Sequence, residues 1–193
     1  MSKNAFLGLA AGSLMVFSTI AWLLSTKVVG ISLWVKIMGY QPFGIQLLAG
    51  VFSGLLWGYL AKQLVTTAYF EPVSTKFRDI LGPMQLNWWE IWIISLCAGI
   101  GEELLFRGSV QPLLGVWPTS ILFVFLHGYL SPFNLRLSLY GIFMVIVIAV
   151  LGYLADFMGL VPAMAAHTLI DVVLLRYLTV SYQPAIREDT PVE

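Results

Sequence analysis

The sequence predicts an all-α integral membrane protein with about six transmembrane helices and one or two short interfacial helices. Of the 193 residues, 59% are hydrophobic and 10% are charged, and the mean hydropathy is +0.88. Soluble domains carry about 25% charged residues, so this chain could not cover a globule with polar surface. Its apolar residues also form several runs close to the ~20 residues that a membrane-crossing helix needs.

Composition also excludes several classes of protein. Ten Lys and Arg residues balance ten Asp and Glu residues, with no basic patch to bind nucleic acid. The single cysteine, Cys97, allows neither a disulfide framework nor a thiolate metal site. A secreted, disordered or nucleic-acid-binding protein is therefore excluded, and the lipid bilayer is the expected surroundings of the chain.

Two long apolar runs open the chain, at 5–24 and 43–61. The first is longer than the core of a signal peptide and continues to Lys27 without a small-x-small cleavage site, so we expect a membrane helix. The second is closed by Lys62. Both runs thus lead into a basic residue, as is typical where a helix reaches the membrane surface.

Glycines recur every four residues in the second run, at Gly50, Gly54 and Gly58. In lipid, such a stripe of small residues lets another helix pack closely. The partner could be another helix of this chain or a second copy, so the oligomeric state stays open.

The remaining sequence alternates polar connections with further apolar runs. Residues 62–90 form the most polar interior stretch and predict a loop with an interfacial helix, while 28–38 predict a short interfacial or re-entrant helix. No linker divides the chain, so we expect one transmembrane domain at 1–183 and a short polar tail at 184–193. Further membrane helices are expected at about 91–105, 116–130, 137–154 and 160–180.

Basic residues predict the orientation, because cytoplasmic loops carry an excess of Lys and Arg. For so compact a membrane protein we expect the inner (plasma) membrane of a bacterium, with the N-terminus in the cytoplasm. With the N-terminus inside, seven basic residues lie on the cytoplasmic side (Lys3, Lys62, Lys76, Arg78, Arg136, Arg176 and Arg187) and three on the other (Lys27, Lys36 and Arg107).

The presence of ionisable residues inside or beside the apolar runs requires an explanation, because a charge at the bilayer centre costs about 2.5–3.5 kcal/mol on insertion scales. Both histidines of the protein are among these residues. A functional site is the expected reason. The residues are Glu102, Glu103, Arg107, His127, His167, Asp171 and Arg176.

The spacing of Glu102, Glu103 and Arg107 distinguishes an ion pair from a free carboxylate. Glu103 and Arg107 are four residues apart, so on a helix they share a face and can neutralise each other. Glu102 lies about 100° around the helix from Glu103, which leaves its carboxylate free for another partner.

Two later helices repeat the four-residue spacing. Phe123 and His127 place an aromatic ring beside an imidazole, and His167 and Asp171 place a carboxylate where it could orient a ring or share its ligand. Each of the three helices thus offers a polar face, and in lipid these faces can meet only one another. We expect them to converge on one buried site that holds water.

Such a site suits hydrolysis of an amide bond. A carboxylate and an imidazole that hold one water can convert it into a nucleophile by general base catalysis. A second histidine and a nearby side chain can donate hydrogen bonds to the developing oxyanion. No serine, cysteine or threonine nucleophile is required.

The same residues carry a family resemblance. Residues 102–107 (EELLFR) fit the motif EExxxR, 123–127 (FVFLH) fit FxxxH, and 167–171 (HTLID) fit HxxxN/D. In their order and their placement on successive helices, they resemble the motifs of the type II CAAX prenyl endopeptidases and their bacteriocin-processing relatives, also called the CPBP or ABI family. The resemblance covers roughly residues 88–180.

The resemblance implies a role for each matching residue. Glu102 would be the general base and would activate water together with His127, while His167 and Asp171 would occupy the oxyanion-stabilising positions. The family often has asparagine at the last of these positions. An ionised Asp171 would repel an oxyanion, so it would have to be protonated or serve to orient His167. Three further residues of the motifs would support the site: Glu103, Arg107 and Phe123.

Two views of the chemistry follow from the resemblance. It points to a metal-free glutamate mechanism, with no cofactor and no metal. Members are nevertheless often labelled metalloproteases, and Glu102, His127 and His167 would also make a two-His, one-Glu zinc set with an open position.

Two functions from different classes remain. The first is an intramembrane endopeptidase that cleaves a peptide or protein substrate near the bilayer surface. The alternative is a non-proteolytic immunity or scaffold protein that keeps the same residues as a buried polar network. Changing Glu102 would abolish cleavage in the first case and be silent in the second. A proton or ion carrier fits less well, because the charges do not run across the membrane.

Overall fold

The computed structural model describes residues 2–182, so the polar tail expected at 184–193 lies outside the described residues. Within that range all regular structure is helical, which confirms the all-α class. Four helices are long and apolar enough to cross a membrane, and they identify an integral membrane protein. They are α1 (Lys3–Leu24, continued by a π-helical turn at Ser25–Val29), α3 (Phe43–Val65), α8 (Leu135–Met158) and α9 (Leu160–Val180).

Two further helices, α5 (Trp88–Leu105) and α7 (Val116–Leu126), lie within the bundle but are less regular as membrane spans. Helix α5 has 18 residues, carries glutamates at both ends and continues into a π-helical turn at Phe106–Val110. Helix α7 has only 11 residues, so the helix expected at 116–130 is shorter than predicted. It ends there because Gly128 turns the backbone at φ +74° directly after His127.

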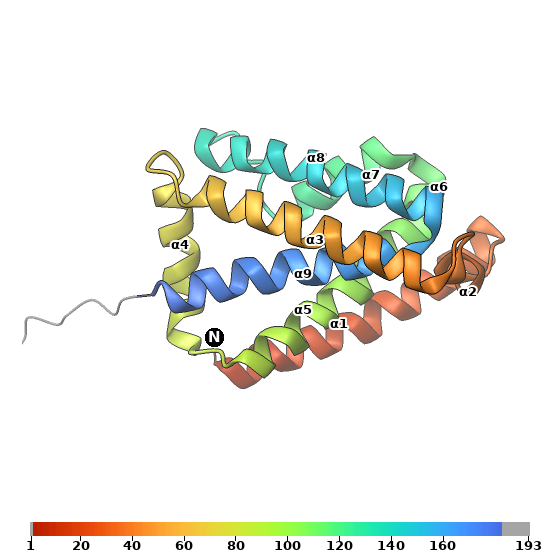
Figure 1. The fold of residues 1–193 in the computed structure, drawn as a ribbon, viewed down its shortest axis with the longest axis horizontal. Coiled ribbons are helices and arrows are strands. Elements are labelled where there is room, and N and C mark those ends of the chain that lie inside the picture. The colour runs from red at the N-terminus through yellow and green to blue at the C-terminus, as the bar shows by residue number, and fades with distance from the viewer. Residues whose placement is uncertain (1, 183–193) are drawn as a thin grey trace, which may run out of the picture.

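The short elements lie at the two ends of the bundle (Figure 1). The expected short helix within 28–38 is present as α2 (Leu33–Met38), which lies at the opposite end of the bundle from the N-terminus and contacts α9 and the π-helical turn at Phe106–Val110. The short helix α6 (Gln111–Leu114) follows that turn. The predicted loop and interfacial helix within 62–90 are present as α4 (Glu71–Leu81), which is followed by a turn of 3₁₀ helix at Gly82–Met84. Helix α4 runs across the direction of the long helices, at the end where α3 and α9 finish.

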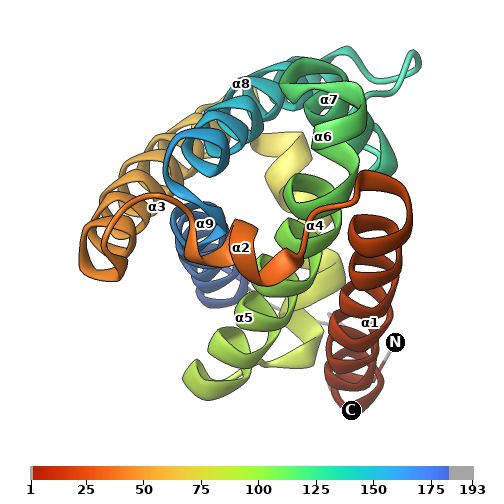
Figure 2. The same ribbon diagram turned by 90° about the vertical axis from the view of Figure 1, so that its right-hand side faces the viewer.

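Helix α9 lies in the middle of the arrangement (Figure 2). It packs against α3, α5 and α8, while α1 packs along the outside of α5 and α7 packs on α8. At the start of α1 and α5, Lys3 Nζ lies 3.0 Å from Glu90 Oε1 and ties the two helices together. Helix α9 therefore lies between α3, α5 and α8, and α7 joins the bundle through its packing on α8.

The stripe of Gly50, Gly54 and Gly58 is the contact between α3 and α9. A Cβ at Gly50 would lie 2.6 Å from the carbonyl oxygen of Pro162, and one at Gly54 would lie 2.7 Å from that of Ala166. The stripe therefore serves packing inside the chain, and it holds α9 at a separation that only glycine permits.

The variant Gly54→Ala tests this contact. The added methyl group would collide with the backbone of α9, and overpacking of this kind costs about 1–3 kcal/mol. We expect thermal unfolding in detergent at a lower temperature than for the wild type. Gly44→Ala, in the same helix, is the control, because nothing lies within 4 Å of its added Cβ. Equal unfolding temperatures for the two variants would contradict the packing described here.

Candidate active site

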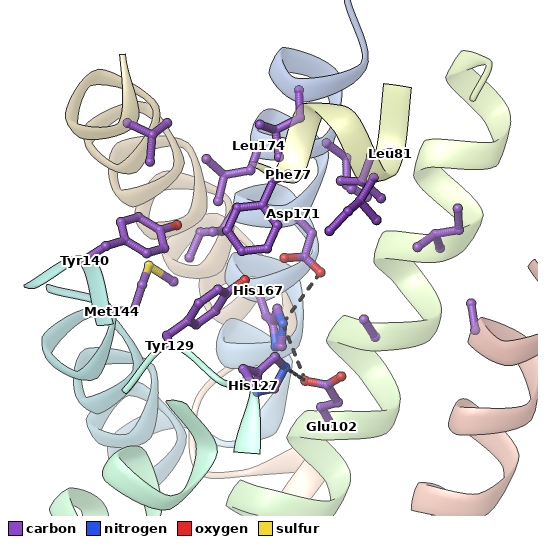
Figure 3. A pocket seen from close by; sticks show the side chains of 18 of the residues that line it. Phe77, Leu81, Glu102, His127, Tyr129, Tyr140, Met144, His167, Asp171 and Leu174 are labelled. Carbon is purple, nitrogen blue, oxygen red and sulfur yellow. Dashed lines mark ion pairs between the residues drawn. The ribbon is translucent and has the colours of Figure 1, made fainter. Parts of the chain in front are cut away.

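A cavity of about 610 Å³ lies among the helices, on the side of the bundle that α4 covers. Its walls come from α1, α3, α4, α5, α7, α8 and α9 and are mostly apolar. Four of the sequence-predicted site residues line it together (Figure 3): Glu102, His127, His167 and Asp171. The expected convergence of three polar helix faces on one site is therefore observed.

Helix α5 presents its two adjacent glutamates in different directions. The helix starts with a capping box in which Asn87 and Glu90 each accept a hydrogen bond from the other's backbone N–H. Near its other end, Glu103 is fully buried and Glu102 faces the cavity with 14% of its side chain exposed. The turn of about 100° between neighbouring residues produces this division, as the sequence predicted.

Glu103 and Arg107 form the expected pair inside the protein. The Nε atom of Arg107 lies 3.1 Å from Glu103 Oε2, and both side chains are fully buried. Arg107 also donates from Nη2 to the carbonyl oxygen of Ile148 on α8 at 3.1 Å, and its guanidinium lies 5.0 Å from the ring centre of Phe123. Arg107 therefore lies in the protein interior. The charge-based prediction of orientation counted it among the basic residues on the non-cytoplasmic side of the membrane.

His127 stands at the end of α7 with one ring nitrogen committed. Its Nδ1 lies 2.7 Å from the carbonyl oxygen of Phe123, and since a carbonyl only accepts, Nδ1 carries a proton. The imidazole stacks on the ring of Phe123 with 4.3 Å between centroids, as the spacing predicted. Its other nitrogen, Nε2, lies 3.4 Å from Glu102 Oε2.

His167 on α9 is held in the same way from the opposite side. Its Nδ1 lies 2.8 Å from Glu103 Oε1, so a buried carboxylate accepts the Nδ1 proton. Its Nε2 lies 3.9 Å from Glu102 Oε2. Both Nε2 atoms thus lie within 3.9 Å of one carboxylate oxygen, Oε2 of Glu102, which is buried and has no hydrogen-bond partner among residues 2–182.

The spacing suggested that Asp171 could either orient the His167 ring or share its ligand, and the contact of Asp171 is with Nε2 of that ring. Its Oδ2 lies 3.7 Å from His167 Nε2, on the side of the ring that faces Glu102. Orientation of the His167 ring falls to Glu103, because the short hydrogen bond at Nδ1 is made there. Asp171 instead adds a carboxylate to the wall of the cavity.

Sequence reasoning missed two cavity residues, Tyr129 and Tyr140. Tyr129 stacks on His127 with 6.0 Å between ring centroids, and the rings of Tyr129 and Tyr140 meet edge to face at 5.5 Å. The only signal for Tyr129 is its place two residues after His127, and Tyr140 has none, because tyrosines in membrane helices usually mark interfaces.

The zinc set of Glu102, His127 and His167 is not formed. Over the described part of the chain, no group of three or more His, Cys, Asp or Glu side chains is arranged to hold a metal ion.

The fold and the site define an all-α membrane protein with a buried glutamate–histidine cluster at an apolar cavity. Residues 84–173, the segment with all three motifs, match the family described as "Type II CAAX prenyl endopeptidase Rce1-like". The family resemblance drawn from the motifs is confirmed over that segment. The matched family is a protease family, which supports an endopeptidase at that level.

A curated relative is similar over part of its length. It is the "Uncharacterized protein YpbD" of Bacillus subtilis (strain 168), 31% identical over 105 residues, which are 53% of this chain and 53% of the relative. The chain thus matches about half the length of this relative. No solved structure matches the chain.

The variant Arg107→Ala tests the buried pair. It would leave Glu103 buried without its counter-charge, and breaking a buried pair in this way typically costs about 3–5 kcal/mol. We expect a marked fall in the unfolding temperature in detergent. Arg78→Ala is the matched control, because Arg78 pairs with Glu71 at 3.1 Å on the surface, where such a pair contributes less than about 1 kcal/mol. If the unfolding temperature falls no further for Arg107→Ala than for Arg78→Ala, the buried pair does not stabilise the fold.

Proposed function

We propose that the protein is an intramembrane endopeptidase, which hydrolyses a peptide bond near the membrane surface with a water activated by Glu102 and His127. One observation carries this proposal. A buried carboxylate oxygen without a hydrogen-bond partner faces two imidazole nitrogens at the wall of an apolar cavity. Buried polar groups are normally hydrogen-bonded, so an oxygen of this kind suits a ligand that donates a proton.

The first step uses the pair of Glu102 and His127. With Nδ1 protonated, neutral His127 presents a lone pair at Nε2, and Glu102 Oε2 is also an acceptor. A water between them can donate one hydrogen bond to each. As its oxygen bonds to the scissile carbonyl carbon, Glu102 takes one water proton, and the π electrons of the C=O bond move to the carbonyl oxygen.

The second step releases the amine. The electron pair on the oxyanion re-forms the C=O bond, the C–N bond breaks, and the proton held by Glu102 passes to the leaving nitrogen. The remaining water proton is lost as the new carboxylic acid ionises, so Glu102 returns to its starting state.

His167 suits stabilisation of the oxyanion. A protonated ring would keep Nδ1–H on Glu103 and direct Nε2–H into the site. Three carboxylates lie around this imidazole, those of Glu102, Glu103 and Asp171, and they favour its charged form. An ionised Asp171 therefore supports the donor state of His167, although it cannot donate a hydrogen bond itself.

The position of the cavity indicates the side of the membrane from which a substrate would enter. It extends from Glu102 towards α4, at the end of the bundle where α1 begins and α3 and α9 end. Basic residues gather at this end, including Lys62 near the end of α3 and Lys76 and Arg78 on α4. We infer that this end is cytoplasmic, that the membrane is the inner membrane of a bacterium, and that a peptide or protein substrate enters from this side.

Replacing Glu102 by glutamine removes the base and keeps the shape. We expect cleavage of a mixed peptide library by the detergent-purified protein to fall by about 10²–10⁴-fold, the usual contribution of a positioned base. The unfolding temperature should stay near that of the wild type. Glu71→Gln, on the exposed face of α4, is the control and should cleave normally. Undiminished cleavage by Glu102→Gln would overturn the assignment of Glu102 as the base, whereas a wild type that cleaves no peptide would favour the non-proteolytic scaffold protein.

Treatment with a chelator separates the glutamate mechanism from a zinc mechanism. Since the proposed base is a carboxylate and no metal set is formed within residues 2–182, we expect the wild-type cleavage rate to be unchanged by EDTA or 1,10-phenanthroline. Loss of cleavage that added zinc restores would overturn the metal-free mechanism while leaving the protein an endopeptidase.

A further inference from the structure

The cavity contains few groups that can donate a hydrogen bond to a substrate carbonyl. Most of its lining is aliphatic or aromatic, and its carboxylates are acceptors when ionised. An oxyanion needs donors aimed at it, and each is worth a large factor in rate. The lining side chains with an N–H or O–H group are Ser13, Ser74, His127, Tyr129, Tyr140 and His167.

Most of these donors are already committed within the protein. Ser13 and Ser74 donate their hydroxyl protons to backbone carbonyls of their own helices at 2.8 Å and 2.9 Å. The Nδ1 proton of His127 goes to a backbone carbonyl and that of His167 goes to Glu103. Among the serine and histidine donors, only the Nε2 atoms of the two imidazoles remain, and Nε2 of His127 faces the proposed base.

The first three residues after α7 offer no further hydrogen-bond donor from their backbone. The N–H groups of His127, Gly128 and Tyr129 all donate to carbonyl oxygens of α7, at 3.2 Å, 2.9 Å and 3.2 Å. An oxyanion hole of backbone amides is therefore absent at these residues. Besides Nε2 of His167, the donors left are the hydroxyls of Tyr129 and Tyr140, neither of which makes a hydrogen bond to another described residue.

Tyr129 is the tyrosine that faces the reacting groups. Its ring lies nearly parallel to that of His127, with 19° between the planes. In Figure 3 its hydroxyl points towards His167 and Asp171, while Tyr140 stands farther from the carboxylates and the imidazoles.

The position of Tyr129 is held from several sides. Gly128 turns the chain back over His127, and the ring of Tyr129 meets Phe77 of α4 edge to face at 5.9 Å. Its backbone lies against α8 at Gly141, where a Cβ would be 2.5 Å from the Tyr129 carbonyl oxygen. Glycine at this point of α8 is what allows the loop to come so close. A donor held in this way is preorganised for a charge that forms during the reaction.

We propose that the Tyr129 hydroxyl donates a hydrogen bond to the scissile carbonyl oxygen as that oxygen becomes an oxyanion. This inference rests on the proposed endopeptidase function and adds a catalytic residue outside the three sequence motifs. A phenol keeps its proton at neutral pH, so it can donate where the ionised carboxylate of Asp171 cannot. The phenol proton stays on Tyr129 throughout, and the proton transfers of the two steps described above are unchanged.

The variant Tyr129→Phe tests the inference, because it removes the hydroxyl and keeps the stacked ring. The probe is the peptide that the wild type cleaves fastest in the mixed library. We expect kcat to fall by about 10²–10³-fold, the usual loss for one oxyanion donor, with little change in KM. The unfolding temperature in detergent should stay within a few degrees of the wild type.

Two control variants make the result specific. Tyr140→Phe removes the other free cavity hydroxyl and should reduce kcat far less than Tyr129→Phe. Tyr153→Phe, on an exposed part of α8, should leave kcat and KM unchanged. If Tyr129→Phe has a wild-type kcat, or if Tyr140→Phe has the larger effect, the assignment is overturned.

Failure of the inference is distinguishable from failure of the proposed function. If the wild type cleaves, Glu102→Gln does not, and Tyr129→Phe matches the wild type, the endopeptidase stands and the Tyr129 donor is rejected. If Glu102→Gln cleaves like the wild type, the water-activating role proposed for Glu102 fails, and the kcat of Tyr129→Phe still decides the oxyanion donor. If the wild type cleaves no peptide, the proposed function fails and the inference fails with it.

Discussion

The buried carboxylate of Glu103 is the group on which the rest of the site depends. It lies 3.1 Å from Arg107 Nε and accepts a hydrogen bond from His167 Nδ1 at 2.8 Å, with no exposed surface of its own. Alone, a carboxylate at this depth would be strongly destabilising, and the guanidinium offsets that cost. Arg107 also donates to the Ile148 carbonyl of α8. Glu103 therefore joins α5, α8 and α9, and by holding one nitrogen of His167 it leaves the other free to face Glu102.

Such a network requires helices that approach one another closely, and glycines on both sides of α9 allow this. A Cβ at Gly99 of α5 would lie 2.8 Å from the backbone nitrogen of Thr168, the residue next to His167. On the other face of α9, Gly54 of α3 meets the backbone at Ala166. In a membrane, where lipid is as apolar as a leucine side chain, close backbone packing and interhelical hydrogen bonds replace the hydrophobic effect as the source of association. The glycines and the buried polar network thus stabilise the same position of α9.

The sequence predicts contacts within one helix better than contacts between helices. The pair of Glu103 and Arg107 follows from a four-residue spacing, and the structure contains it. The same spacing suggested that Asp171 could orient His167 or share its ligand, but the hydrogen bond that orients the ring is made by a carboxylate 64 residues away. Spacing cannot reveal this, because it depends on how α5 and α9 meet. Tyr129 was missed for a similar reason: its place is set by the turn after α7 and by the close approach of α8. The catalytic roles of these residues stay predictions.

The short helix α7 explains how a polar site can lie at depth in a bilayer. Its 11 residues rise about 16 Å, roughly half of the ~30 Å hydrocarbon core, so it ends inside the bundle. Non-helical backbone at that depth is tolerated only where protein or a water-filled cavity surrounds it. Here the N–H groups of residues 127–129 donate to carbonyl oxygens of α7, and the Ser138 hydroxyl of α8 forms hydrogen bonds with the backbone of Ser131. Many backbone polar groups of the loop are therefore hydrogen-bonded within the protein. His127 stands at the point where helix gives way to loop, and the cavity beside it extends towards α4. A half-length helix therefore places the imidazole of His127 inside the bundle, at the wall of the cavity that α4 also lines.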